Sequence, residues 1–217
     1  MGEMLSESLR RVVFLSVIAS AGLMVVAEPL VYAIFHRGAF LAADAARTGE
    51  LLVVFSLSLV AWASQSLVVR GFYAREDTVT PMVIGTVVLA VMLPVYAGLS
   101  SWMGPAGLAL STGLGIGLNV TLTLVTYKWR GYALPLWPVG GALLRALGIA
   151  GAAAGASVGV RVWVEGHLVW TSFWGASLGV IAIGGVFALV LCGAAALLRP
   201  PELMVVWEKV LRKLGRG

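Results

Sequence analysis

Six apolar stretches of about 20 residues each, the length of helix that crosses the hydrocarbon core of a bilayer, dominate this chain. Backbone polar groups must be paired within such a segment, so each stretch is expected to be a helix. With 60% hydrophobic and 12% charged residues, a chain of 217 residues is too apolar to fold as a soluble globule. We therefore predict an all-α, polytopic membrane protein. Its spans lie near 12–35, 49–69, 81–101, 105–127, 143–164 and 172–198.

Two shorter segments flank these spans. Residues 1–11 form a charged segment that we expect in the cytoplasm. A signal peptide over the first span is the alternative, which is disfavoured because two glutamates offset Arg10 and Arg11 and because apolar residues continue to Phe35. Residues 199–217 carry apolar residues at helical spacing with basic residues between them. This pattern predicts a basic amphipathic helix on the membrane surface, with a solvated tail as the alternative.

The basic residues divide unevenly between the two sides that alternating spans create. Of the 15 Lys and Arg residues, Arg37, Arg47 and Arg161 fall on the side opposite the N-terminus, and the others share its side. Basic residues concentrate on the cytoplasmic side of membrane proteins. We therefore predict that both termini are cytoplasmic.

Tryptophans mark the ends of the predicted spans, as expected from their enrichment at membrane–water interfaces. Trp62 is the exception, because it lies in the interior of the second span. The tryptophans near span ends are Trp102, Trp129, Trp163, Trp170 and Trp174.

The stretch from Val68 to Pro81, VVRGFYAREDTVTP, interrupts the apolar pattern with charge. Thr80 followed by Pro81 is typical of a helix start. A threonine oxygen can accept hydrogen bonds from free backbone N–H groups, and proline at the first helical position forfeits none. We predict a cytoplasmic turn between two helices, with Thr80 as the cap of the second one.

Residues able to carry out chemistry are sparse. The middle third of every span lacks the charged residue that a membrane-embedded enzyme or proton relay needs. His36 and His167 fall in different loops, away from other ligands at metal-binding spacing, and Cys192 is the single cysteine. We expect no catalytic site, no bound metal ion or cofactor, and no nucleic-acid partner.

Polar and glycine residues inside the spans have two interpretations each. Buried polar groups favour hydrogen bonds between helices, and contact with a substrate is the alternative. Glycines four residues apart favour close helix packing, and an open groove is the alternative. The polar residues are Gln65, Asn119, Thr121 and Thr123; the glycines are Gly151, Gly155 and Gly159 on the fifth span and Gly175 and Gly179 on the sixth.

Three motifs, in order, resemble those of a known family. They are FHRGAF within the stretch at 35–52, the stretch at 68–81, and GPAGLALSTGLGIGLN at 104–119. Over roughly residues 5–130 they resemble the MurJ/MviN family of lipid II flippases, of the MOP exporter superfamily. Its pattern is F-x-R-G-A-F, then R-x-F-Y-A-x-x-D-T-x-T-P, then G-x-A-G-L-A-L-x-T and a later Asn. The matching positions, which are candidates for substrate or motif roles, are Arg37, Gly38, Phe40, Arg70, Tyr73, Asp77, Thr80, Pro81 and Asn119.

The resemblance implies a role in transport. The six spans correspond to the family's last six, the carboxy-terminal lobe of a transporter whose two lobes rock against each other. The implied activity moves a polyprenyl-linked cell-wall precursor, lipid II, from the inner to the outer leaflet of the bacterial inner (cytoplasmic) membrane. The family's pyrophosphate-gripping arginines belong to the amino-terminal lobe. The implied partners are therefore that lobe, in cis or in trans, the precursor and membrane lipids.

Two finer expectations follow from the resemblance. Some members bind a coupling sodium ion through an Asn and an Asp in the helix after T-P. Met92 and Tyr96 occupy those positions here, and neither is a hard oxygen ligand of that kind, so we do not expect sodium coupling there. The family's last two helices are thought to hold the lipid tail, which makes the glycines at 151–159 and 175–179 candidates for a tail groove.

Two alternatives to a lipid II flippase stay open. One is a non-transporting membrane scaffold of the envelope machinery, which keeps the helical lobe and binds other envelope proteins. The other is a polysaccharide-unit flippase or drug exporter of the same superfamily, against which the hairpin motif argues.

Overall fold

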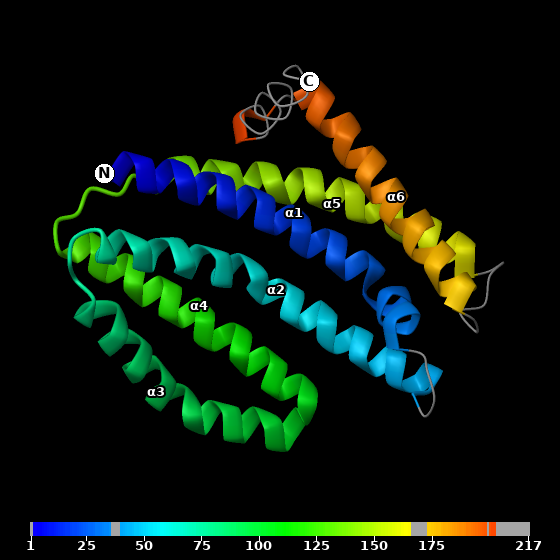
Figure 1. The fold of residues 1–217 in the computed structure, drawn as a ribbon, viewed down its shortest axis with the longest axis horizontal. Coiled ribbons are helices and arrows are strands. Elements are labelled where there is room, and N and C mark those ends of the chain that lie inside the picture. Colours follow the sequence, from blue (N-terminus) through cyan, green and yellow to red (C-terminus); the bar gives the residue numbers. More distant parts are fainter. Residues whose placement is uncertain (1, 36–39, 166–172, 199, 203–217) are drawn as a thin grey trace, which may run out of the picture.

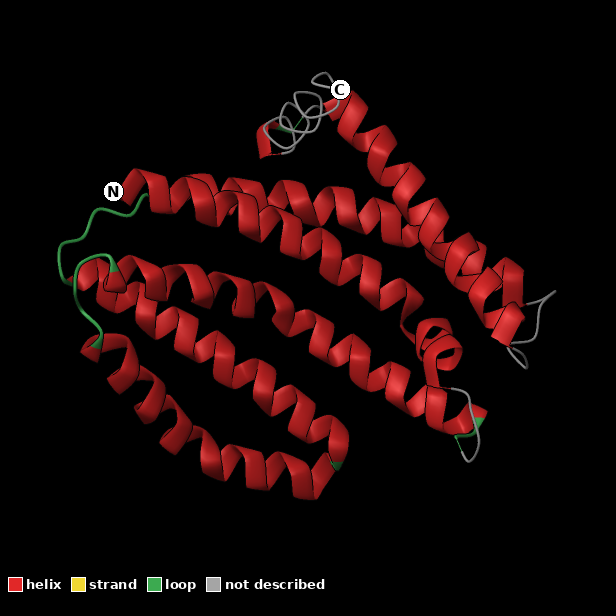
Figure 2. Ribbon diagram, in the orientation of Figure 1, coloured by secondary structure: helices red, strands yellow, loops and turns green. Residues whose placement is uncertain are grey.

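The computed structural model describes residues 2–35, 40–165, 173–198 and 200–202. In these ranges all the regular elements are α-helices, and six of them are long and apolar enough to cross a membrane (Figure 2). The predicted all-α membrane fold is confirmed, whereas the amphipathic helix expected at 199–217 lies outside the described residues beyond Glu202. The helices are α1 (Gly2–Phe35), α2 (Ala42–Tyr73), α3 (Val79–Met103), α4 (Pro105–Trp129), α5 (Trp137–Glu165) and α6 (Phe173–Leu198).

Three helices begin several residues before the predicted spans. Helix α1 starts at Gly2 rather than 12, α2 at Ala42 rather than 49, and α5 at Trp137 rather than 143. Hydropathy marks where a helix enters hydrocarbon, while the helix itself extends as far as its terminal groups are satisfied. At the start of α2, for example, the Asp44 carboxylate accepts a hydrogen bond from the Leu41 N–H at 2.9 Å.

Helix α1 lies at the centre of the arrangement and packs against α2, α5 and α6 (Figure 1). Helix α2 lies between α1 and α4, and α3 packs mainly on α4. Successive helices alternate in direction, so the N-terminus, the α2–α3 loop and the α4–α5 connection share one end (Figure 1). A helix that three others contact is a poor fit to a signal peptide.

The largest buried core forms where α1, α5 and α6 meet. Phe14 of α1 and Ile183 of α6 have no exposed surface, and Ala146 and Ala153 of α5 are equally buried between them. Glycine also contributes to this packing, because a Cβ atom on Gly22 of α1 would lie 3.1 Å from the Phe187 ring of α6.

Helix α3 presents aliphatic side chains to its surroundings. Val83, Val87 and Leu93 are 48%, 51% and 60% exposed. Such a surface suits contact with lipid tails rather than water. Its connection to α4 is a single residue, Gly104, with φ of +61°, a backbone conformation that glycine adopts without steric penalty.

Candidate functional site

Asp77, in the loop between α2 and α3, caps the first turn of α3. This corrects the capping role that the sequence predicts for Thr80. The Oδ1 atom of Asp77 accepts a hydrogen bond from the Thr80 N–H at 3.0 Å. Helix α3 begins at Val79, so Pro81 is its third residue, and it is buried. An ionised carboxylate is a stronger acceptor than a hydroxyl for the free N–H groups of a first helical turn. The motif therefore starts a helix as predicted, but two residues earlier and through a different side chain.

The same carboxylate ties the loop to the end of α4. Its Oδ2 atom lies 2.7 Å from Nη1 of Arg130, and the Asp77 side chain is 13% exposed. The Thr80 backbone N–H, with a smaller contribution from Arg130, holds the pKa of Asp77 below its ordinary value of 3.8. Asp77 is therefore ionised at neutral pH and holds both partners.

A cluster of rings anchors this end of the bundle. Phe72 and Tyr127 are fully buried and meet edge to face, with ring centroids 5.1 Å apart. The Arg75 guanidinium lies 3.9 Å from the ring centroid of Tyr132, and its Nε donates a hydrogen bond to the Tyr127 hydroxyl at 3.3 Å. Gly71 faces Tyr127, where a Cβ would lie 3.3 Å from the ring. The hairpin motif therefore packs as one unit with the α4–α5 connection.

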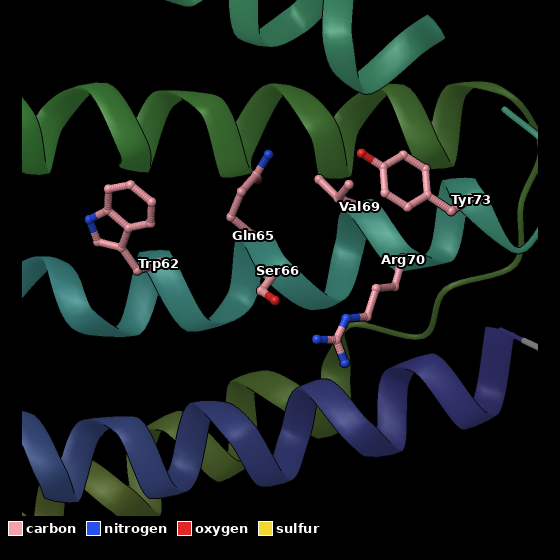
Figure 3. Close-up of a pocket in the computed structure, with 6 residues that line it drawn as sticks. All are labelled: Trp62, Gln65, Ser66, Val69, Arg70 and Tyr73. Carbon is pink, nitrogen blue, oxygen red and sulfur yellow. The ribbon is translucent and has the colours of Figure 1, made fainter. Parts of the chain in front are cut away.

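Other motif residues point away from this cluster. Arg70 is exposed and Tyr73 is 53% exposed. With four more residues on the same face of α2 they line an open hollow of about 300 Å³. Figure 3 shows this face, with the Gln65 amide directed toward α4 and the Arg70 guanidinium toward α1. The lining residues are Trp62, Gln65, Ser66, Val69, Arg70 and Tyr73.

A polar network crosses from α2 to α4 beside this hollow. The Gln65 amide nitrogen donates to the Asn119 side-chain oxygen at 2.7 Å, and it lies 3.4 Å from the Thr123 hydroxyl. Thr123 donates to the Asn119 backbone oxygen at 2.7 Å. These three residues therefore make the predicted hydrogen bonds between helices. Thr121 is exposed and donates to Gly117 within its own helix.

The outer-loop motif is only partly described. Arg37 and Gly38 lie outside the described residues. Phe40 packs against Phe35, with ring centroids 6.1 Å apart, and against the buried group that includes Val31 and Ala45. In the described chain its contacts are therefore with other apolar side chains, and its predicted motif role stays a prediction.

The glycines of α5 do not pack against a described neighbour. A Cβ atom on Gly151, Gly155 or Gly159 would meet nothing within 4 Å, so the close packing that their spacing favours is wrong for these positions in the described chain. On α6, Gly179 is buried and Gly175 partly buried. Close packing of glycines occurs elsewhere, at Gly22 beside Phe187 and at Gly49 beside Glu28, and the sequence pattern did not single out either glycine.

Ion pairs join α5 to its neighbours at both ends. Arg161 contacts Glu28 of α1. At the opposite end the Glu202 side chain, which has no exposed surface, contacts Arg145 of α5 and lies 3.6 Å from Nε of Arg10. These partners are far apart in sequence, so no local spacing predicts them.

The positions expected to lack sodium ligands are used for packing. Met92 is 5% exposed, and its Cγ lies 3.5 Å from where a Cβ of Gly115 would be. The Tyr96 hydroxyl lies 3.2 Å from the same point. In the described residues there is no group of three or more His, Cys, Asp or Glu side chains that could hold a metal ion.

The chain is similar in sequence to a known family of membrane proteins. The model of the family "Lipid II flippase MurJ" matches residues 1–191. A probable lipid II flippase MurJ of Rhizobium meliloti (strain 1021) is 32% identical over 127 residues, which cover 58% of this chain and 24% of the relative. Its counterpart in Vibrio cholerae serotype O1 is 29% identical over 192 residues, or 88% of this chain and 35% of the relative.

A solved structure agrees in fold. A lipid II flippase MurJ in an inward closed conformation superposes with a TM-score of 0.65 at 20% identity, covering 91% of this chain and 40% of that one. The chain thus spans well under half the length of these proteins. Because the family model matches nearly all of its six helices, the chain belongs to the lipid II flippase MurJ family.

Proposed function

We propose that this chain is the carboxy-terminal lobe of a lipid II flippase, which moves the precursor from the inner to the outer leaflet by alternating access. The observation that carries this proposal is the match of the family model to residues 1–191. The family is one of transporters. The proposed location is the bacterial cytoplasmic membrane, with both termini in the cytoplasm, in keeping with the uneven distribution of Lys and Arg.

The proposal includes an amino-terminal lobe as partner, in cis or in trans. The solved flippase is more than twice as long as the part that this chain covers. The spans of this chain also carry no charge in their middle thirds, where a diphosphate crossing the membrane needs compensation for lost hydration. A second set of helices has to supply that charge.

The open glycines of α5 support a groove for the polyprenyl tail. Gly151, Gly155 and Gly159 remove side chains from one exposed face of the helix, and a Cβ at any of them would meet open space. An apolar tail needs only shape and many dispersion contacts, each about 0.1–0.2 kcal/mol. On α6 the candidate glycines are Gly175, which is partly buried, and Gly179, which is buried, so the open part of the proposed groove lies on α5.

Growth rescue tests the proposal. Cells depleted of their own flippase are supplied with this chain alone, with an amino-terminal lobe of the family alone, or with both. We expect growth when both parts are supplied together. We expect no growth when either part is supplied by itself. Rescue by this chain alone contradicts the two-lobe proposal, and failure of the pair, when both parts are present in the membrane, favours the scaffold.

A further inference from the structure

The exposed face of α2 differs in chemistry from a surface that meets lipid. Its residues at 62, 65, 66, 69, 70 and 73 recur at helical spacing and line the hollow in Figure 3. Helix α3 exposes valines and leucines, whereas this face carries an arginine, an amide, a hydroxyl and two aromatic rings. We call these six residues the α2 stripe. Polar groups at membrane depth usually face a cavity or another polar surface.

Trp62 is the clearest sign that the α2 stripe does not face lipid. Its side chain is 55% exposed, yet it lies in the interior of a span rather than at an interface. The other exposed tryptophans, such as Trp102 at 80%, lie at helix ends, where the indole N–H reaches the headgroup region. An exposed indole in the interior of a span therefore calls for a polar partner for its N–H.

Several polar groups of the stripe lack a partner among the described residues. The Oε1 atom of Gln65 is buried without a hydrogen bond. Arg70 is exposed and forms no ion pair with a described residue, whereas Arg130 and Arg145 of the same end pair with carboxylates. A buried polar atom left unpaired is unfavourable unless a ligand or water satisfies it.

The hydroxyl of Ser66 shows the same contrast. Ser56, Ser58 and Ser64 on α2 each donate to a backbone oxygen of their own helix, at 2.7 Å. Ser66 makes no such bond within the described chain and faces the hollow. Its donor is available for a ligand.

We infer that the α2 stripe is a subsite for a sugar–diphosphate headgroup; this inference rests on the proposed function. Arg70 pairs with phosphate oxygens through charge-assisted hydrogen bonds. Ser66 bonds a sugar hydroxyl, and the indole of Trp62 packs against the apolar face of a sugar ring. Residues 62 and 70 are separated by about 12 Å of helix rise, so they contact successive parts of one headgroup rather than the same group.

The subsite is tested on the full chain in lipid nanodiscs, with ligand binding followed by native mass spectrometry. The probes are lipid II and a polyprenyl monophosphate, which lacks the sugars. Arg70→Ala should weaken binding of both probes by about tenfold or more. Trp62→Leu should weaken binding of lipid II severalfold and leave the monophosphate unchanged. Thermal unfolding of each variant confirms that it remains folded.

Matched controls separate the subsite from general charge or hydrophobicity. Arg47→Ala changes another exposed arginine of α2, and Trp102→Leu another exposed tryptophan, and both should bind lipid II as the unchanged chain does. The inference is overturned if Arg70→Ala binds normally, if Arg47→Ala loses as much affinity, or if the unchanged chain does not distinguish the two probes. Normal binding by the stripe variants together with growth rescue leaves the proposed function standing and the subsite wrong. Loss of assembly with the amino-terminal lobe at unchanged lipid II affinity makes the stripe a protein contact and likewise contradicts the subsite.

Discussion

At the loop between α2 and α3, the two oxygens of one carboxylate have separate partners. Oδ1 of Asp77 accepts from the Thr80 N–H, and Oδ2 pairs with Arg130 at the end of α4. The first contact starts α3, and the second fixes the hairpin against the next helix pair. Thr80 and Pro81, on which the sequence interpretation relied, lie within the first turn of the helix instead of capping it.

Removing this side chain should destabilise the chain measurably. Replacing a capping Asp by Ala costs about 0.5–2 kcal/mol. We expect Asp77→Ala to lower the free energy of unfolding in detergent by that amount, and Asp77→Asn by less, since the amide keeps an acceptor oxygen. Glu76→Gln in the same loop is the matched control and should have little effect.

The pH dependence follows from the lowered pKa of Asp77. A carboxylate with a lowered folded-state pKa contributes stability above its ordinary value of 3.8 and loses it as the pH falls through the folded-state pKa. The difference between the unchanged chain and Asp77→Ala should therefore be constant near neutral pH and shrink below about pH 4. A difference that stays constant down to pH 2 argues against the ionised cap.

At the scale of elements, glycines on neighbouring helices serve opposite purposes. A Cβ at Gly155 of α5 would meet nothing within 4 Å, whereas one at Gly22 of α1 would lie 3.1 Å from the Phe187 ring. Spacing in the sequence singled out the α5 glycines and passed over Gly22. Periodicity identifies a face of a helix, but the partner of that face depends on contacts between distant segments.

The same substitution should have different effects on stability at Gly155 and at Gly22. Gly155→Leu should leave thermal unfolding unchanged, while Gly22→Leu should destabilise by about 1–3 kcal/mol through overpacking. In a complex with an amino-terminal lobe, Gly155→Leu should also reduce crosslinking of a photoreactive polyprenyl lipid to α5 and α6. Unchanged crosslinking in a folded Gly155→Leu complex rules out the tail groove.

The sequence was sufficient to predict the helices but not the contacts between them. Apolar runs predicted all six helices, because length and hydropathy decide which segments cross a bilayer. The extensions of α1, α2 and α5 beyond those runs depend on caps and packing, which hydropathy does not measure. The Glu202 contacts with Arg10 and Arg145 join three distant segments, so they became visible in the structure alone.

At the scale of the whole molecule, the chain matches a minor part of the length of known flippases. The matched region is 91% of this chain and 40% of the solved flippase. Within this chain, Arg161 of α5 pairs with Glu28 of α1, and at the opposite end Glu202 bridges Arg145 of α5 and Arg10 of α1. The motif hairpin is tied to α4 by Asp77 and to the α4–α5 connection by Arg75. Contacts of this kind link the helices, so in the proposed two-lobe transporter we expect them to move together as one body.

Transport of lipid II in proteoliposomes tests this account most directly. Fluorescent lipid II is placed in the vesicles, and its movement between leaflets is followed by quenching from outside. The account predicts no movement above protein-free vesicles with this chain alone, and movement when an amino-terminal lobe of the family is reconstituted with it. Movement catalysed by this chain alone would contradict the claim that it is one lobe of a two-lobe flippase.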